Sequence, residues 1–270
     1  MSDRRVALVT GASSGIGRVT AKALLKEGMT VYVAARRMER MEELVAQGAI
    51  AIPLDLTEEE SIAKAVERVE SESGRVDVLV NNAGYGSYGT VEDIPIEEAK
   101  RQFEVNLFGL ARLTQLVLPR MREQRFGRII NVSSMGGRIY TPLGAWYHAT
   151  KHALEGWSDS LRLELRPFGI GVIVIEPGVI ETGWGNIAVE SARRRSGDTA
   201  YAEYTRQVTE TMENAYREGG SSPPEVVATS ILRAVKARRP KTRYAVGKLA
   251  KPLLFMRHWL SDNAFDRLVR

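Results

Sequence analysis

The sequence predicts a single doubly wound α/β domain, in which helices cover both faces of one parallel sheet. Short runs rich in β-branched residues alternate with longer segments of helical periodicity along the 270 residues. The short runs are apolar almost throughout, which is typical of strands that are buried on both faces. A hydrophobic content of 44% is enough for one chain of this length to form a full core.

Six segments are predicted to be strands, and a seventh is expected near the C-terminus. They are residues 5–10, 30–35, 49–54, 76–81, 127–133 and 170–176, followed by 242–247. Helical periodicity is expected over residues 15–28, 38–47, 59–73, 96–124, 145–168 and 224–238. No repeat or linker divides the sequence, so we expect one domain over residues 1–270.

Two segments depart from this alternation. Residues 178–223 follow the sixth predicted strand and therefore lie at the carboxyl end of the sheet, where open α/β folds bind ligands. We expect a substrate lid there, and the alternative is an ordinary surface loop with two helices. Residues 248–270 are expected to form a helical tail that mixes apolar and basic side chains. Such a tail covers a pocket or a subunit interface, or makes peripheral contact with an anionic membrane.

Charge and composition exclude several classes of function. The net charge is +5, but residues 223–270 hold eleven Lys and Arg against three Asp and Glu, which gives +8 there and leaves −3 for residues 1–222. With no basic recognition helix or stacking aromatics beside it, nucleic acid is not an expected partner. The sequence has no cysteine and three scattered histidines, so no metal site is expected. A strand begins after five residues and no long apolar run occurs, so a cytoplasmic location is expected.

The first predicted strand runs directly into the glycine-rich turn TGASSGIG, Thr10 to Gly17, and then into a helical segment. In this context glycines let the backbone approach a pyrophosphate, and the helix N-terminus adds free N–H donors. Dinucleotide contacts are expected from Gly11, Ser13, Ser14, Gly15, Ile16 and Gly17. A purely structural turn is the alternative.

The end of the second predicted strand favours NADP(H) over NAD(H). A carboxylate at this point would accept from the ribose 2′-hydroxyl of NAD, but the residue here is Ala35. Arg36 follows it and is expected to hold the 2′-phosphate by charge-assisted hydrogen bonds. Arg37 is a second candidate, and its alternative role is the start of a solvated helix.

Tyr147 and Lys151 are four residues apart, so on a helix they share one face. Reducing a carbonyl by hydride develops an alkoxide that must be protonated, and Tyr147 is the candidate donor. For the reverse reaction, the Lys151 ammonium and a positive nicotinamide are expected to lower the Tyr147 pKa. A serine at the end of the fifth strand, Ser133 or Ser134, can donate to the substrate oxygen.

Taken in order, these motifs resemble those of the short-chain dehydrogenase/reductase family over roughly residues 4–185. They are TGASSGIG (10–17), NNAG (81–84), Asn106, INVSS (130–134), YHATK (147–151) and PGVIET (177–182). The resemblance implies that Ser134 is the catalytic serine, that Asn106 holds a water in a proton relay, and that Lys151 bonds the nicotinamide ribose. It also implies that Asn81 is structural and that further cofactor contacts come from Asp55, Leu56, Asn82, Ala83, Gly84, Pro177, Gly178, Val179, Ile180 and Thr182.

The side chains expected to face the reacting carbon are largely apolar and aromatic. They are Tyr85, Met135, Tyr140, Trp146, Trp184 and Ile187, although some of these aromatics could belong to the core. Such a set favours a lipophilic ketone, aldehyde or secondary alcohol. The resemblance points to ketoreductases and hydroxysteroid or retinol dehydrogenases that form homodimers or homotetramers. The alternatives are a non-catalytic NADP(H)-binding sensor or scaffold, and an enoyl reductase or sugar epimerase on the same fold.

Overall fold

The computed structural model describes residues 4–216 and 219–269, and its centre is one sheet of seven strands. The strands are β1 (Val6–Thr10), β2 (Thr30–Ala35), β3 (Ile50–Pro53), β4 (Val78–Asn81), β5 (Gly127–Val132), β6 (Ile170–Pro177) and β7 (Arg243–Val246). Their order is β3-β2-β1-β4-β5-β6-β7 and every neighbouring pair is parallel. The predicted doubly wound fold is confirmed, and the order reverses between β1 and β4.

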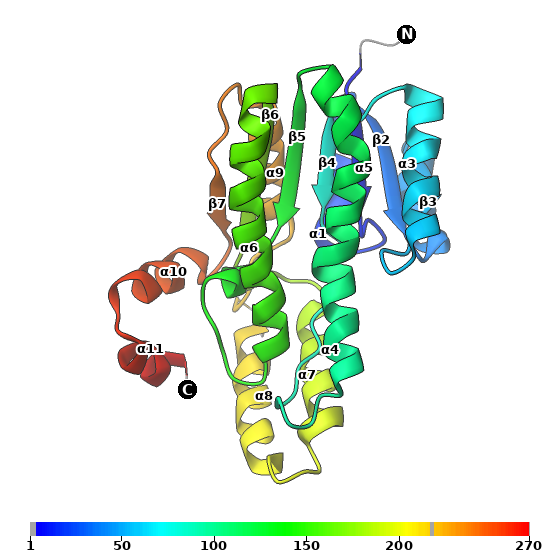
Figure 1. Cartoon of the computed structure of the whole chain (residues 1–270). Helices are drawn as coiled ribbons and strands as arrows, with labels where there is room; N and C mark the ends of the chain where they lie inside the picture. Colours follow the sequence, from blue (N-terminus) through cyan, green and yellow to red (C-terminus); the bar gives the residue numbers. More distant parts are fainter. Residues whose placement is uncertain (1–3, 217–218, 270) are drawn as a thin grey trace.

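Helices cover both faces of the sheet (Figure 1). The α-helices, including those that lie beyond the strand ends, are α1 (Gly15–Lys26), α2 (Glu42–Ala46), α3 (Glu59–Ser73), α4 (Ile96–Phe103), α5 (Gly109–Glu123), α6 (Ala145–Leu165), α7 (Trp184–Ser196), α8 (Ala202–Tyr216), α9 (Glu225–Lys236), α10 (Ala250–Trp259) and α11 (Asp262–Val269). Alternate strand side chains point to opposite faces, so two cores form. Leu24 of α1 and Ile231 of α9 pack in one core, and Val66 of α3 and Val117 of α5 pack in the other.

The long helix predicted over residues 96–124 is wrong in one respect, because the structure interrupts it. Helix α4 ends at Phe103, a π-helical turn follows over Glu104–Phe108, and α5 begins at Gly109. Apolar periodicity continues through the turn, so the sequence gives no sign of it. Asn106 lies in this turn, and π-helical turns are frequent at functional sites.

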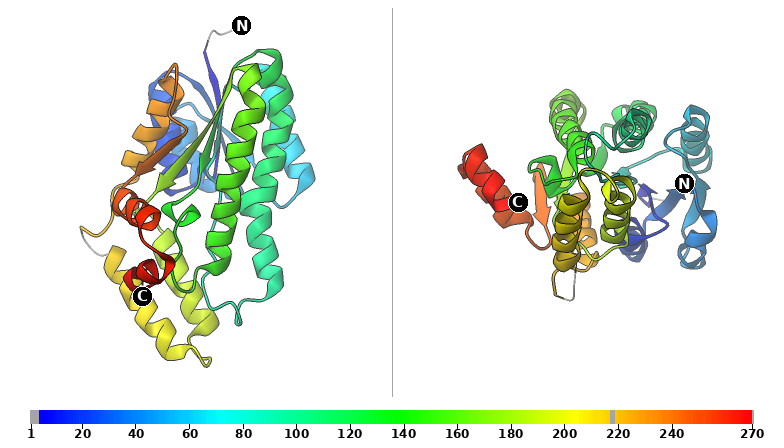
Figure 2. Two further views of the ribbon diagram at one scale, coloured as in Figure 1. Left: turned by 60° about the vertical axis from the view of Figure 1, so that its left-hand side comes forward. Right: turned by 90° about the horizontal axis from the view of Figure 1, so that it is seen from below.

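The segment 178–223 and the tail both lie at the carboxyl end of the sheet. Figures 1 and 2 place α7 and α8 beyond the strand ends, with α10 and α11 beside them. Residues 217 and 218 of the expected lid and residue 270 of the tail lie outside the described residues. Within the part of the chain that the structure describes, no helix is both long enough and apolar enough to span a membrane.

A buried polar bridge joins the two central strands to the helices on one face. The Asn81 amide donates to Asn131 Oδ1 (2.9 Å) and to Thr114 Oγ1 of α5 (3.1 Å). The Asn131 amide in turn donates to Ser158 Oγ of α6 (2.9 Å). All four residues are buried, so each hydrogen bond replaces one that water would otherwise supply. The bridge fixes where α6 crosses β5.

We predict that Asn131→Ala lowers the free energy of unfolding by about 2–4 kcal/mol, because two buried hydrogen bonds are lost and a cavity is left. Urea unfolding followed by circular dichroism measures the change. The exposed Asn214 of α8 provides a matched control, and Asn214→Ala should stay within about 0.5 kcal/mol of wild type. An equal effect of the two substitutions would contradict the prediction.

Candidate active site

The glycine-rich turn wraps tightly around the start of α1. Gly11 has a φ of +66°, and a Cβ there would lie 2.8 Å from the Ala83 Cα. A Cβ on Gly17 would collide with the Gly11 carbonyl oxygen. Only glycine therefore fits these two positions without a shift of the backbone. The turn leaves a cradle at the N-terminus of a 12-residue helix, which suits a phosphate group.

Thr10 connects this turn to the NNAG segment. Its hydroxyl accepts from the backbone N–H groups of Asn82 and Ala83 (both 3.0 Å) and lies 3.2 Å from the Val80 carbonyl oxygen, to which it donates. The Asn82 amide donates back to the carbonyl oxygen of Thr10 (3.0 Å). The turn after β1 and the turn after β4 therefore form one hydrogen-bonded unit, as expected for two walls of a cofactor cleft.

The segment after β6 closes a third side of the cradle. The Val179 N–H donates to the Lys248 carbonyl (2.9 Å), and the Ser222 N–H donates to the Val179 carbonyl (3.0 Å). These bonds hold the segment in place, and a Cβ on Gly15 would lie 3.2 Å from Thr182 Cγ2. The structure thus brings Thr182 next to the glycine turn.

Arginines gather where β2 ends. Arg36 and Arg37 are exposed, and Ala35 offers no carboxylate. Arg18, which the sequence analysis missed, donates through Nη2 to the carbonyl oxygens of Ser13 (2.5 Å) and Arg40 (3.0 Å). Its position directly after Gly17, at the end of the glycine-rich turn, could have marked it as a candidate cofactor contact. The cluster suits a ligand with an additional phosphate at this edge.

Asp55 lies near this arginine cluster. Its carboxylate accepts from the N–H (2.9 Å) and hydroxyl (2.8 Å) of Thr57. Burial alone would raise the Asp55 pKa, but the Thr57 hydrogen bonds and the nearby Arg36 guanidinium hold it below its usual value. Asp55 is therefore charged at neutral pH and stabilises the loop next to Leu56.

Ser134, Tyr147 and Lys151 converge at the end of β5. Ser134 Oγ accepts from the Gly136 N–H (3.0 Å) and hydrogen-bonds to the Tyr147 hydroxyl. Lys151 is buried and donates from Nζ to the Val132 carbonyl (2.9 Å). Burial lowers the Lys151 pKa to about 8, while the Glu155 carboxylate opposes this change.

The Tyr147 pKa differs from the expectation that Lys151 would lower it. Burial raises the pKa to about 12, and only the hydrogen bond with Ser134 opposes the rise. In the protein chain alone, desolvation of the phenolate therefore outweighs any help from the ammonium. At neutral pH the Tyr147 hydroxyl holds its proton, which is the state that a proton donor needs.

Asn106 fastens the segment after NNAG to the helix that carries Tyr147. Its Nδ2 donates to the Tyr85 carbonyl (2.9 Å) and to Thr150 Oγ1 (3.1 Å), and its Oδ1 accepts from the Tyr85 N–H (3.0 Å). A Cβ on Gly84 would lie 3.0 Å from Asn106 Oδ1 and 3.7 Å from Lys151 Nζ. The side chain thus acts as a clamp close to the lysine, and its role in a water relay stays a prediction.

An aromatic layer covers Tyr147. The Trp184 ring lies 5.1 Å from the Tyr147 ring, and Tyr88 contacts both at 5.8 Å from Tyr147 and 5.6 Å from Trp184. Together with Leu143 and residues of α7 and α8 they form a third, smaller core. Trp184 therefore lies where substrate contact was expected, whereas Tyr88 was missed because a lone tyrosine in a loop carries no signal of its direction.

Other expected substrate residues take different positions. The Tyr140 hydroxyl donates to Asp266 of α11 (2.9 Å) and its ring packs on Phe265, so it fastens the tail. Burial raises the Tyr85 pKa to about 12, and the charged groups nearest its hydroxyl belong to Glu98, Arg101 and Arg195. Met135 and Trp146 are half-buried, and Ile187 is exposed.

His148 is buried directly after Tyr147 on α6. Its Nε2 accepts from the Thr141 N–H (3.0 Å), so Nδ1 carries the proton and donates to the Gly136 carbonyl (2.9 Å). Burial lowers the His148 pKa to about 4, which keeps the ring neutral. Through these two bonds the His148 ring holds the loop after Ser134 against the start of α6.

Two buried carboxylates, Glu155 of α6 and Glu176 of β6, lie near the Lys151 turn of α6. Glu155 is one helical turn beyond it and accepts from Arg243 Nε (3.0 Å), while Glu176 at the end of β6 lies 3.6 Å from Arg243 and 3.7 Å from Arg138. Burial and the Glu155 charge raise the Glu176 pKa to about 7, and the two guanidinium groups only partly oppose this. No sequence motif predicts this pair, because only the fold brings α6 and the end of β6 together.

Comparison with known proteins agrees with this geometry. Residues 5–191 match the short chain dehydrogenase family. The chain is 36% identical over 268 residues to a 3-ketodihydrosphingosine reductase of Bacteroides thetaiotaomicron, with 98% of this chain and 97% of the relative covered. It is 35% identical over 276 residues to an NADPH-dependent 3-dehydrocapnine reductase of Ornithobacterium rhinotracheale, with 98% and 95% covered. A crystal structure of a short-chain dehydrogenase from Streptomyces avermitilis superimposes with a TM-score of 0.80 at 36% identity, covering 94% of this chain and 92% of the other.

The raised Glu176 pKa predicts a pH-dependent stability. The Glu176 pKa is raised from the ordinary 4.5 to about 7 in the folded protein, so protonated Glu176 favours the folded state. This contribution to stability is fully present below pH 4.5 and is lost as the pH rises through 7. Between pH 5 and pH 8 the free energy of unfolding of wild type should therefore fall by about 2–3 kcal/mol more than that of Glu176→Gln. Urea unfolding at both pH values measures the difference, with the exposed Glu190→Gln as control. Parallel pH profiles for wild type and Glu176→Gln would refute the assignment.

Proposed function

Because the chain belongs to the short-chain dehydrogenase/reductase family, we propose that it is an NADP(H)-dependent oxidoreductase that interconverts a lipophilic ketone or aldehyde and its alcohol. The observation that carries the proposal is the convergence of Ser134, Tyr147 and Lys151 beside the glycine turn. A sensor or scaffold would have no need of this set. Both named relatives are reductases of keto compounds, which favours carbonyl reduction over enoyl reduction.

The cradle fits a dinucleotide with a 2′-phosphate. Gly11, Gly15 and Gly17 would admit the pyrophosphate, Arg36 and Arg18 would hold the 2′-phosphate, and Thr182 would meet the nicotinamide end. When bound, the reduced nicotinamide supplies the hydride. Ser134 would orient the substrate oxygen, and Tyr147 would deliver its proton to that oxygen as negative charge develops. Lys151 would hold the ribose and place positive charge near the phenolate.

We predict that Arg36→Ala weakens NADPH binding by about 1.5–3 kcal/mol, the range for a hydrogen bond to a charged group, and leaves NADH binding nearly unchanged. Fluorescence titration with each cofactor measures the two constants. Arg120→Ala, at the far end of α5, is a control with the same loss of charge. Equal losses for NADPH and NADH would remove the argument for a phosphate contact.

Tyr147→Phe should lower kcat about 10²- to 10⁴-fold and leave the Kd for NADPH nearly unchanged, because the hydroxyl delivers a proton but is not needed to hold the dinucleotide. Lys151→Ala should lower kcat and also raise the Kd for NADPH, because the ammonium supports the phenolate and holds the ribose. A panel of ketones, aldehydes and enones, followed by NADPH consumption, supplies the assay. If Tyr147→Phe retained more than about a tenth of the rate, Tyr147 would not be the acid.

We further propose that residues 178–223 act as a lid over the aromatic layer. Helices α7 and α8 supply Ala188, Ala192, Val208 and Met212 to the core around Tyr147, so their movement would open it. Hydrogen exchange should show faster exchange of α7 and α8 amides than of β4 amides in the free protein, and slower exchange once NADPH and an alcohol product are bound. Protection equal to that of β4 in the free protein would mean a fixed segment.

A further inference from the structure

Helix α10 exposes two large aromatic side chains to solvent. Phe255 is 66% exposed and Trp259 is 70% exposed, and the two rings contact each other at 6.3 Å. Lys251 lies one turn before Phe255, so the three side chains form one stripe along the helix at a spacing of four. Large exposed aromatics gathered in this way mark an interaction surface.

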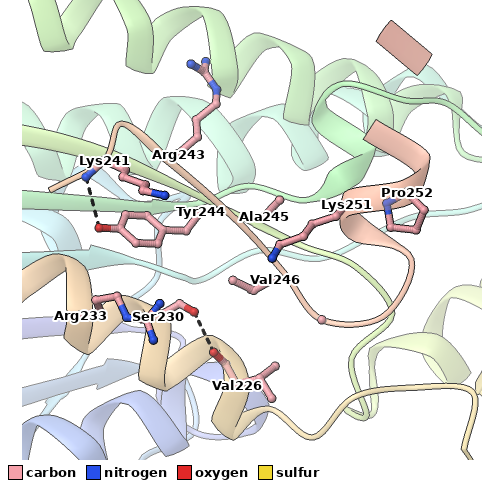
Figure 3. Close-up of a pocket in the computed structure, with 11 residues that line it drawn as sticks. Val226, Ser230, Arg233, Lys241, Arg243, Tyr244, Ala245, Val246, Lys251 and Pro252 are labelled. Carbon is pink, nitrogen blue, oxygen red and sulfur yellow. Dashed lines mark hydrogen bonds between the residues drawn. The ribbon is translucent and has the colours of Figure 1, made fainter. Parts of the chain in front are cut away.

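The stripe begins at a basic cavity of about 580 Å³ between α9, β7 and α10. Figure 3 shows Arg233 of α9, Lys241 before β7 and Lys251 of α10 around it, and Tyr244 and Val246 of β7 also line it. No acidic residue lines the cavity. Within the described residues, none of these three cations forms an ion pair. Arg243 also borders the cavity, but its guanidinium is turned toward α6, where Glu155 and Asp159 bind it.

The tail is held firmly from its other side. Phe265 is fully buried, the Arg257 guanidinium lies over the rings of Tyr140 (5.4 Å) and Phe265 (5.6 Å), and Asp266 accepts from Tyr140. Tyr140 follows the loop that carries Ser134. The stripe is therefore a fixed feature of α10, which Figures 1 and 2 place at the periphery of the molecule near the carboxyl end of the sheet, and its two aromatic side chains are exposed.

From this placement we infer that α10 and the basic cavity dock the protein peripherally on an anionic lipid bilayer. Phe255 and Trp259 would enter the headgroup boundary, where aromatic rings are favoured, and the three cations would meet lipid phosphates. A second copy of the chain fits this face less well, because face-to-face contact would bring the unpaired cations of both copies together. The inference goes beyond the proposed reaction and does not depend on which carbonyl is reduced.

Cosedimentation with vesicles tests the docking without any assay of turnover. The full chain should bind vesicles of equal parts phosphatidylglycerol and phosphatidylcholine and not vesicles of phosphatidylcholine alone. Raising NaCl from 0.05 M to 0.5 M should weaken binding about tenfold or more, because exposed charges are screened. The double variant Lys241→Gln/Lys251→Gln should lower the partition coefficient about tenfold or more, since each cation near the surface contributes about 1 kcal/mol.

The variant Phe255→Ser/Trp259→Ser should abolish vesicle binding, and Tyr204→Ser, which removes an exposed aromatic of α8, should leave it intact. Circular dichroism and light scattering on all variants confirm that fold and assembly are unchanged. Three outcomes overturn the inference. They are equal binding to both vesicle types, no binding to either, and a change of oligomeric state in the Phe255/Trp259 variant, which would assign the face to a second copy.

Discussion

A buried ammonium is the constraint on which the site depends. Lys151 cannot keep its charge in the interior without a partner, and the Val132 carbonyl at the end of β5 is that partner. The neighbouring residues of β5 complete the arrangement. Asn131 pins α6 to the strand through Ser158, and Ser134 meets Tyr147 on the same helix. The four residues 131–134 therefore set the position of α6, the carbonyl partner of Lys151 and the hydroxyl partner of Tyr147.

The sequence predicted the sheet well and placed Tyr147 and Lys151 on one helix, because both depend on local patterns, while the catalytic roles of these residues stay a prediction. Apolar runs mark the strands, and a spacing of four between Tyr147 and Lys151 survives any change in the loops around them. The π-helical turn at Asn106 was not predictable, because the apolar pattern of α4 continues into α5. The burial that raises the Tyr147 pKa in the protein alone was not predictable either, since it depends on helices α7 and α8, which lie far away in the chain.

Side-chain direction in loops was the weakest part of the sequence analysis. Tyr85 and Tyr140 follow functional motifs at plausible spacings, but one has Glu98, Arg101 and Arg195 as its nearest charges and the other fastens the tail. Tyr88 lies three residues beyond Tyr85 and contacts Tyr147 instead. Periodicity defines the faces of helices and strands, whereas a loop has none, so spacing in the sequence could not distinguish these tyrosines. The proximity of Glu155 and Glu176 was not predicted for a related reason, since only the fold brings α6 and the end of β6 together.

The same aromatic layer that raises the Tyr147 pKa also bears on substrate selection. The rings of Trp184 and Tyr88 both pack against the Tyr147 ring. A site of this kind binds mainly by apolar contact, and one methylene more or less in such a pocket changes discrimination by only about 1–3 kcal/mol. Shape complementarity would then select the lipophilic body, while the two hydroxyls require a carbonyl or alcohol at one point. Under the proposed function, strict chemistry at the reacting carbon and tolerance along the rest of the substrate would both follow from one feature, the burial of Tyr147.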